Sequence, residues 1–380
     1  MHPAGRRTPL PDTPDIVDDA STGIVLWTER PGIARAPSPA LVAWSSERAA
    51  FRTLEFLTAN IRNKHTRRAY QAAAKRFLVW CKARSLTLPD LRSPDVAEYI
   101  EELSLRLAPL SVKQHLAALK HWFDWLVTGH VLEANPARAV RGPRYSQDAG
   151  KTPVLDKEEA KALLATIDVE LKALREADEK AAAEGPASSP GQAARRQLAQ
   201  ERRHRRRIVA LRDKALIAVM LFSYARIGAV VRMKVRDYRG AGTPRAALLL
   251  HEKNGKEHVV PAHHVAAEYL DAYLALAELV GQPDAPLWQN APGHSRKLSG
   301  GALSERGALD IVKRRAKDAN LSDDVCNHSF RATGITLHQD AGGDLEAARQ
   351  LAGHANIKTT QLYNRSGDRK RRAEVERVQL

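Results

Sequence analysis

The stretch Arg212–Tyr238, RDKALIAVMLFSYARIGAVVRMKVRDY, contains the longest uncharged apolar run of the chain, the eleven residues 215–225. A run of that length predicts a helix buried in a globular core, because a membrane span needs about 20 apolar residues. Arg226 follows the run directly, and burying an unpaired guanidinium costs free energy. The position therefore requires an anion, which is either a ligand or a structural carboxylate such as Asp237.

The composition of the 380-residue chain points to a polyanionic partner. The 60 Lys and Arg residues against 44 Asp and Glu give a formal net charge of +16 at pH 7. Such a surplus is typical of nucleic-acid-binding proteins, because each cation placed on a phosphate releases a counterion. Ordinary basic solubility is the alternative that composition leaves open. The two cysteines, Cys81 and Cys326, cannot make a disulfide framework, and no secretory signal is visible, so we expect a cytoplasmic protein.

The first part of the chain predicts an arm and then a helical domain. Seven of the 20 prolines fall in the first 39 residues, so we expect residues 1–45 to form a flexible arm. Helical periodicity over residues 46–141 predicts a compact unit of about four helices. One helix is expected to start at Ser93, and another at Ser111, which forms a capping box with Gln114. Between residues 61 and 141, 14 basic and seven acidic residues give +7, which favours a DNA-binding role over a merely solvated surface.

A second domain is predicted from residue 154 to 367, after a linker at 142–153 and before a tail at 368–380. Asp156 and Glu159 form a capping-box pattern at its start. Residues from about 168 to 207 read as a charged insertion, in which residues 195–207 carry seven arginines and one glutamate. The arginine run is either a phosphate-contacting helix or a solvated helix extension, and the sequence leaves both open.

The clearest strand signal is AALLLHEKNGKEHVVP, residues 246–261. Two apolar runs flank Asn254-Gly255, the dipeptide that best tolerates a type I′ turn. A hairpin here would expose Lys253 and Lys256 at its tip. We therefore expect a mainly α protein with a small β-hairpin or sheet, an α+β second domain, and a helical first domain.

Phosphodiester chemistry is the reaction that the remaining polar residues suit best. The chain has no Gly-rich phosphate loop and no metal-binding spacing, so no cofactor is expected. His328 and Arg331 occur in HSFR, on one face of a predicted helix, and His354 precedes Tyr363 by nine residues. A tyrosine can supply a nucleophile and arginines can neutralise phosphate oxygens, while a lysine can donate a proton to the leaving oxygen.

These segments together resemble the tyrosine recombinases, also called the phage integrase family. The resemblance lies in Arg212–Tyr238, HEKNGKEHVVP (251–261), HSFRATGIT (328–336) and LAGHANIKTTQLYN (351–364), and it covers roughly residues 48–367. It implies a C-shaped DNA clamp made of a helical core-binding domain and a catalytic domain. It also implies the following roles: phosphate binding by Arg226 and Arg331, acid–base catalysis by His328, a phosphate hydrogen bond from His354, protonation of the leaving 5′-oxygen by Lys253 (with Lys256 as the alternative), and nucleophilic attack by Tyr363.

Two features depart from the family pattern, namely the arginine-rich insertion and Ala229, which stands where the family usually has a carboxylate. The resemblance implies a site-specific recombinase or integrase that acts as a tetramer on double-stranded DNA through a Holliday junction, with accessory DNA-bending or directionality proteins, and that serves a mobile genetic element. A type IB-like topoisomerase and a non-catalytic DNA-binding regulator are the alternatives.

Overall fold

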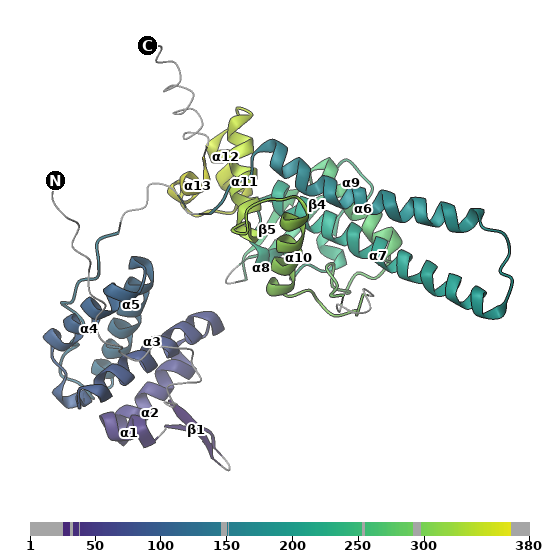
Figure 1. Ribbon diagram of the computed structural model, residues 1–380. Coiled ribbons are helices and arrows are strands. Elements are labelled where there is room, and N and C mark those ends of the chain that lie inside the picture. Colours follow the sequence, from purple (N-terminus) through teal and green to yellow (C-terminus); the bar gives the residue numbers. More distant parts are fainter. Residues whose placement is uncertain are drawn as a thin grey trace, which may run out of the picture. The chain divides into compact units, whose positions relative to one another are not determined.

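The chain divides into two compact units, Met1–Ser146 and Gln147–Leu380. The computed structural model describes residues 26–30, 33–37, 39–145, 150, 152–252, 255–291 and 298–365. Both units are mostly helical, and the second contains a small antiparallel sheet of three strands (Figure 1). The predicted fold class is confirmed. The division between the units falls inside the segment predicted as a linker.

The first unit is a helical bundle around an aromatic core. Trp44 stacks on Trp122 with ring centroids 5.5 Å apart, and the ring of Phe77 meets Phe123 edge to face. Its regular elements are β1 (Trp27–Arg30), β2 (Ile33–Pro37), α1 (Pro39–Ser45), α2 (Glu47–Glu55), a π turn (Phe56–Asn60), α3 (Lys64–Ala83), a 3₁₀ turn (Leu88–Asp90), α4 (Ser93–Arg106) and α5 (Pro109–Thr128).

The structure differs from the sequence prediction at the ends of several of these elements. A hairpin and a helix occupy part of the expected arm, and Leu26, Leu41 and Trp44 are buried in the core of this unit. Helix α5 starts at Pro109 rather than Ser111, because proline's fixed φ suits the first helical position. The composition of residues 1–45 did not reveal the packed part of the expected arm, because the frequent prolines there obscured the few residues that pack.

The second unit is built around the apolar run that precedes Arg226. Residues 215–220 of α7 are at most 1% exposed. The regular elements here are α6 (Lys157–Ala183), α7 (Pro190–Ser223), α8 (Ile227–Val230), a 3₁₀ turn (Val235–Asp237), β3 (Tyr238–Arg239), β4 (Ala247–His251), β5 (Glu257–Pro261), α9 (His264–Leu276), α10 (Glu305–Asp318), α11 (Asn327–Asp340), α12 (Leu345–Leu351) and α13 (Ile357–Tyr363). The predicted capping box of Asp156 and Glu159 is present at the start of α6.

The segment predicted as an insertion consists of the far ends of α6 and α7. These two helices project from the rest of the unit as a long helical hairpin (Figure 1). Arg203 and Arg207 of α7 both pair with Asp178 of α6. Three further arginines of the run also have carboxylate partners: Arg196 with Glu184, Arg205 with Glu201 and Arg206 with Glu170. These ion pairs favour the helix-extension interpretation over phosphate contact.

The predicted β-hairpin is confirmed, but the expected two-residue type I′ turn is wrong. His251 lies opposite Glu257 and the N–H of Glu252 donates to the carbonyl oxygen of Lys256, so three residues rather than two separate the paired ends. Strands β4 and β5 pair antiparallel with Leu249 opposite Val259, and β3 adds to the other edge of β4. Gly255 has a φ of 74°, which glycine adopts without strain. Lys253 and Asn254 lie outside the described residues.

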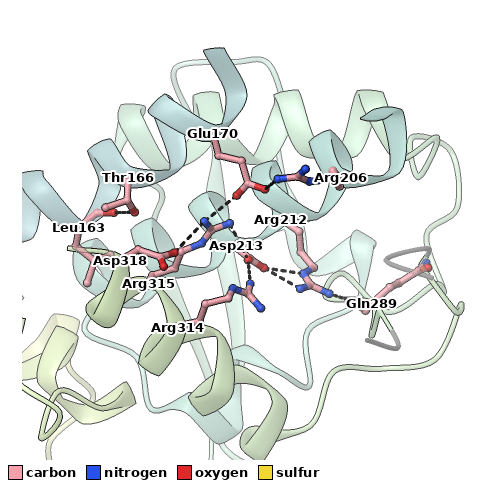
Figure 2. Close-up of polar contacts among 10 residues, drawn as sticks. All are labelled: Leu163, Thr166, Glu170, Arg206, Arg212, Asp213, Gln289, Arg314, Arg315 and Asp318. Atoms are coloured by element: carbon pink, nitrogen blue, oxygen red, sulfur yellow. Dashed lines mark hydrogen bonds and ion pairs between the residues drawn. The ribbon is translucent and has the colours of Figure 1, made fainter. Parts of the chain in front are cut away.

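A buried ionic cluster connects α6, α7 and α10. Figure 2 shows Asp213, which is fully buried, accepting hydrogen bonds from Arg212, Arg314 and Arg315. Arg315 also donates to Glu170 at 2.8 Å. Burial opposes ionisation of the Glu170 carboxyl, but its hydrogen bonds with Arg315 and Arg206 outweigh that effect and lower its pKa. Each cation of the cluster thus has a carboxylate partner.

Candidate active site

The chain leaves the buried helix α7 through a sharp turn that brings Arg226 toward solvent. Tyr224 adopts the left-handed conformation with φ 53° and ends the helix, and Arg226 then caps α8. The Arg226 side chain is 42% exposed, and its Nη1 pairs with Oε2 of Glu252 at 2.8 Å. Asp237, the structural carboxylate considered from the sequence, instead accepts from the backbone N–H of Lys234.

Helix α11 carries Arg331 into the space behind this turn. Gly334 makes the close approach possible, because a Cβ at that position would overlap the carbonyl oxygen of Leu221 and the ring of Tyr224. Arg331 is 1% exposed. Its guanidinium donates to the carbonyl oxygens of Tyr224 and Ala352, the latter at 2.8 Å.

Arg331 is a buried cation with no carboxylate partner among the described residues. Burial, and then the charge of Arg226, lowers its pKa to about 10, so it remains protonated at neutral pH. Its Nε is also buried without a hydrogen-bond acceptor in the described part of the chain. A buried guanidinium in this state provides charge and a donor for an anion.

His354 lies directly against Arg331 and is neutral. Burial, followed by the charges of Arg331 and Arg226, lowers its pKa to about 3. Arg331 Nη2 donates to His354 Nε2, so the proton of the neutral ring is on Nδ1, which donates to Thr360 Oγ1 at 2.9 Å. The histidine therefore orients Arg331 in this state.

Tyr363 completes the cluster as the last residue of α13. Its ring stacks on His354 with centroids 5.5 Å apart and an interplanar angle of 11°. The guanidinium carbon of Arg331 is 5.6 Å from the centre of the tyrosine ring. Tyr363 is partly exposed, and its carbonyl oxygen accepts from Thr336 Oγ1 at 3.2 Å. The ring of Tyr363 thus contacts both a neutral histidine and a buried guanidinium.

His328 lies in the first turn of α11, three residues before Arg331. Its pKa is lowered by desolvation and by the charges of Arg331 and Arg226, while Glu305 acts in the opposite direction. Arg226, Arg331, His328, His354 and Tyr363 are thus close enough to interact, directly or electrostatically. Lys253 lies outside the described residues, and Lys256 is exposed on the hairpin.

Sequence reasoning missed three polar groups near this cluster. Glu252 directly precedes Lys253 in the sequence, but no local pattern indicates its contact with Arg226. The hydrogen bond between Thr360 and His354 is likewise a tertiary contact that no sequence motif predicts. Ala229 is 1% exposed and supplies no carboxylate. A nearby carboxylate is that of Glu305, which lies next to Gly228, the residue before Ala229. A Cβ built on Gly228 would be 2.8 Å from Glu305 Oε1.

Among the described residues, no three His, Cys, Asp or Glu side chains lie together as a metal site would require. Likewise, none of the described helices has the length and apolar character needed to cross a bilayer.

The cluster therefore combines a buried arginine that has no described carboxylate partner with a neutral histidine and a tyrosine. Residues 196–370 match the phage integrase family, and residues 54–130 match the phage integrase N-terminal SAM-like domain. The chain belongs to the phage integrase family, and it is a tyrosine-type site-specific recombinase.

Curated relatives carry the same designation. The chain is 27% identical over 277 residues to tyrosine recombinase XerC of Serratia marcescens, a match that covers 73% of this chain and 75% of that protein. It is 26% identical over 257 residues to tyrosine recombinase XerD of Mycobacterium leprae, covering 68% of this chain and 70% of that protein.

Solved structures share the fold. XerH recombinase bound to a palindromic difH substrate, in a post-cleavage complex, matches with a TM-score of 0.59 and 16% identity over 88% of this chain and 96% of that one. A lambda integrase dimer bound to a COC′ core site matches with a TM-score of 0.55 and 15% identity, covering 86% of this chain and 77% of that one.

Proposed function

We propose that this recombinase cleaves and rejoins double-stranded DNA through a 3′-phosphotyrosine, without a metal ion. The observation that carries the proposal is the convergence of Arg331, His354 and Tyr363. The Tyr363 oxygen attacks the scissile phosphorus as the bond to the 5′-oxygen breaks. Attack by a 5′-hydroxyl on the phosphotyrosine reverses the step, so the strands reseal without ATP because the bond energy is conserved.

The other residues act on the charge and protons of that step. Arg226 and Arg331 bind the non-bridging oxygens with permanently charged donors. His328, neutral near pH 7, serves as the acid–base partner. Lys253 protonates the leaving 5′-oxygen, with Lys256 as the alternative. When phosphate binds, Arg331 Nη2 donates to a phosphate oxygen instead of to His354 Nε2. His354 then changes tautomer: its proton lies on Nε2 and donates to the phosphate, while Thr360 Oγ1 donates to Nδ1.

The proposed partner is duplex DNA, in keeping with the DNA-bound relatives. A cavity of about 430 Å³ in the second unit is lined by four basic residues, Arg232, Lys234, Arg236 and Arg239, and by two acidic ones, Asp237 and Glu257, so cations are in excess there. Phosphate contacts of this kind predict binding that weakens steeply with salt.

We further propose that both units clamp the duplex and that four protomers exchange strands through a Holliday junction. Residues 368–380 would dock on a neighbouring protomer, and accessory proteins would set the direction of recombination. The protein would serve a mobile genetic element and act on DNA in the cytoplasm.

Trapping the covalent intermediate tests the proposal. Purified protein is incubated with nicked fragments of the DNA that flanks its gene, and SDS-stable protein–DNA adducts are captured and sequenced. We expect wild type to form adducts at one recurrent sequence and Tyr363→Phe to form none.

Three results would count against the proposal in different ways. Absence of any wild-type adduct fits a non-catalytic DNA-binding regulator. An adduct with Tyr363→Phe assigns the nucleophile elsewhere. Relaxation of supercoiled DNA lacking a specific site, with no exchange between two sites, fits a topoisomerase.

A further inference from the structure

Glu252 is a buried carboxylate at the base of the β4–β5 hairpin for which the proposed reaction has no role. Its side chain is 8% exposed, and its Oε2 accepts from Arg226 Nη1 at 2.8 Å. Its Oε1 is buried with no hydrogen-bond partner among the described residues. The backbone N–H of Glu252 donates to the carbonyl oxygen of Lys256 at 2.8 Å, which fixes the residue at the end of the strand ladder.

The contact with Arg226 uses only one edge of the guanidinium. Arginine has five N–H donors in a planar fork, and Glu252 takes one of them. The Arg226 side chain is 42% exposed, so the remaining donors can reach a ligand. Glu252 thus anchors one terminal nitrogen of the guanidinium and leaves its other donors uncovered by this carboxylate.

The same carboxylate also acts on Arg331. Its negative charge favours the protonated guanidinium and so partly offsets burial and the charge of Arg226. Glu252 therefore supports the charge of Arg331 as well as contacting Arg226 directly.

We infer that Glu252 is the positioning residue for Arg226, and this inference rests on the proposed function. An arginine side chain has many rotamers, and a cleavage site depends on holding its donors at fixed distances from the phosphate. The buried carboxylate selects one rotamer before DNA arrives. The effect is expected in the cleavage rate rather than in DNA affinity, because the bulk of the affinity comes from other phosphate contacts.

The test compares single-turnover cleavage at saturating DNA for Glu252→Ala, Glu252→Gln and wild type. Glu252→Ala should lower the rate constant roughly 100-fold, the cost of a displaced catalytic group, with the DNA dissociation constant little changed. Glu252→Gln should retain most of the rate, since an amide oxygen accepts the same hydrogen bond. Glu257→Ala, an exposed carboxylate on the same hairpin, is the matched control and should cleave like wild type.

Chemical rescue separates positioning from a structural role. In Arg226→Ala, free guanidinium at non-denaturing concentration should restore part of the cleavage, because Glu252 can hold the cation in the vacated place. Adding Glu252→Ala should remove the rescue. The inference fails if Glu252→Ala cleaves as fast as wild type, or if rescue persists in the double variant. Absence of cleavage by wild type would overturn the proposed function itself.

Discussion

Two groups of buried arginines lie in the second unit, and they differ in what neutralises them. Arg212 and Arg315 share the carboxylate of Asp213, and Arg315 also reaches Glu170 (Figure 2). Arg331 is equally buried, but its donors go to two backbone carbonyls and to a neutral histidine. Each arginine of the first group therefore contacts a carboxylate, whereas Arg331 contacts none among the described residues.

The presence or absence of a carboxylate partner distinguishes arginines that stabilise the fold from an arginine that can bind an anionic ligand. Burying a charge is costly, and the protein recovers that cost in the first group by pairing each guanidinium with a carboxylate. In the second group no described carboxylate pairs with Arg331, so part of the cost is recovered only when an anion binds. A phosphodiester is the anion that the family's reaction supplies. The comparison makes four predictions, given from the largest effect to the smallest.

Removing the shared carboxylate should produce the largest effect. Asp213→Ala leaves three arginines without their common partner, and breaking a buried pair in this way costs about 3–5 kcal/mol. Urea denaturation measures the loss in the free energy of unfolding. Asp318→Ala, whose carboxylate is 44% exposed and 3.6 Å from Arg315, is the control and should cost less than about 1 kcal/mol. Equal losses for both would remove the distinction between the two groups.

Removing Arg226, the half-exposed arginine whose charge acts on Arg331, should affect catalysis. Arg226→Ala is expected to lower the single-turnover cleavage rate by about 10²–10³-fold, since it deletes a donor to the developing phosphate charge. DNA binding, measured by titration at fixed salt, should weaken only modestly. A large loss of binding with normal cleavage at saturation would instead assign Arg226 to affinity.

The neutral state of His354 predicts a pH dependence of stability. Its pKa is about 3 in the folded protein and near 6.5 when exposed, so the unfolded chain binds more protons between these values. Stability therefore falls as pH drops from 6.5 toward 3, by at most about 1.4 kcal/mol per pH unit from this group. His354→Asn, which cannot titrate there, should show a shallower slope in denaturation series at several pH values. Identical slopes would mean that His354 takes up its proton equally in the folded and unfolded states, so that its pKa is not lowered by folding.

The smallest effect is expected in the α6–α7 hairpin. Arg203→Ala removes an ion pair with Asp178 near the surface, and such pairs contribute about 0–1 kcal/mol. Both unfolding and DNA affinity should change little. If DNA binding instead fell strongly, the arginine run would be a phosphate-contacting surface, the interpretation that the ion pairs do not favour. Arg195→Ala, in the same run, is a useful companion variant.

The sequence predicted the helical fold and the residues that the structure brings together, for identifiable physical reasons. The apolar run before Arg226 and the capping box at Asp156 are local signals, and the two apolar runs around residues 254–255 predicted the hairpin although not its register. Glu252 and Thr360 were missed because their partners come from other elements, and no local pattern encodes such a contact. The packing of Leu26 and Trp44 was missed because the frequent prolines of the first 39 residues obscured the few residues there that pack.

One comparison tests the central claim most directly: Arg331→Lys against Arg315→Lys, each assayed for unfolding and for adduct formation at saturating DNA. Both variants keep a positive charge and lose the planar fork. The two-group account predicts that Arg331→Lys loses cleavage by at least about 100-fold, whereas Arg315→Lys cleaves within a few-fold of wild type and loses mainly stability. Normal cleavage by Arg331→Lys, or its loss in folded Arg315→Lys, would contradict the account.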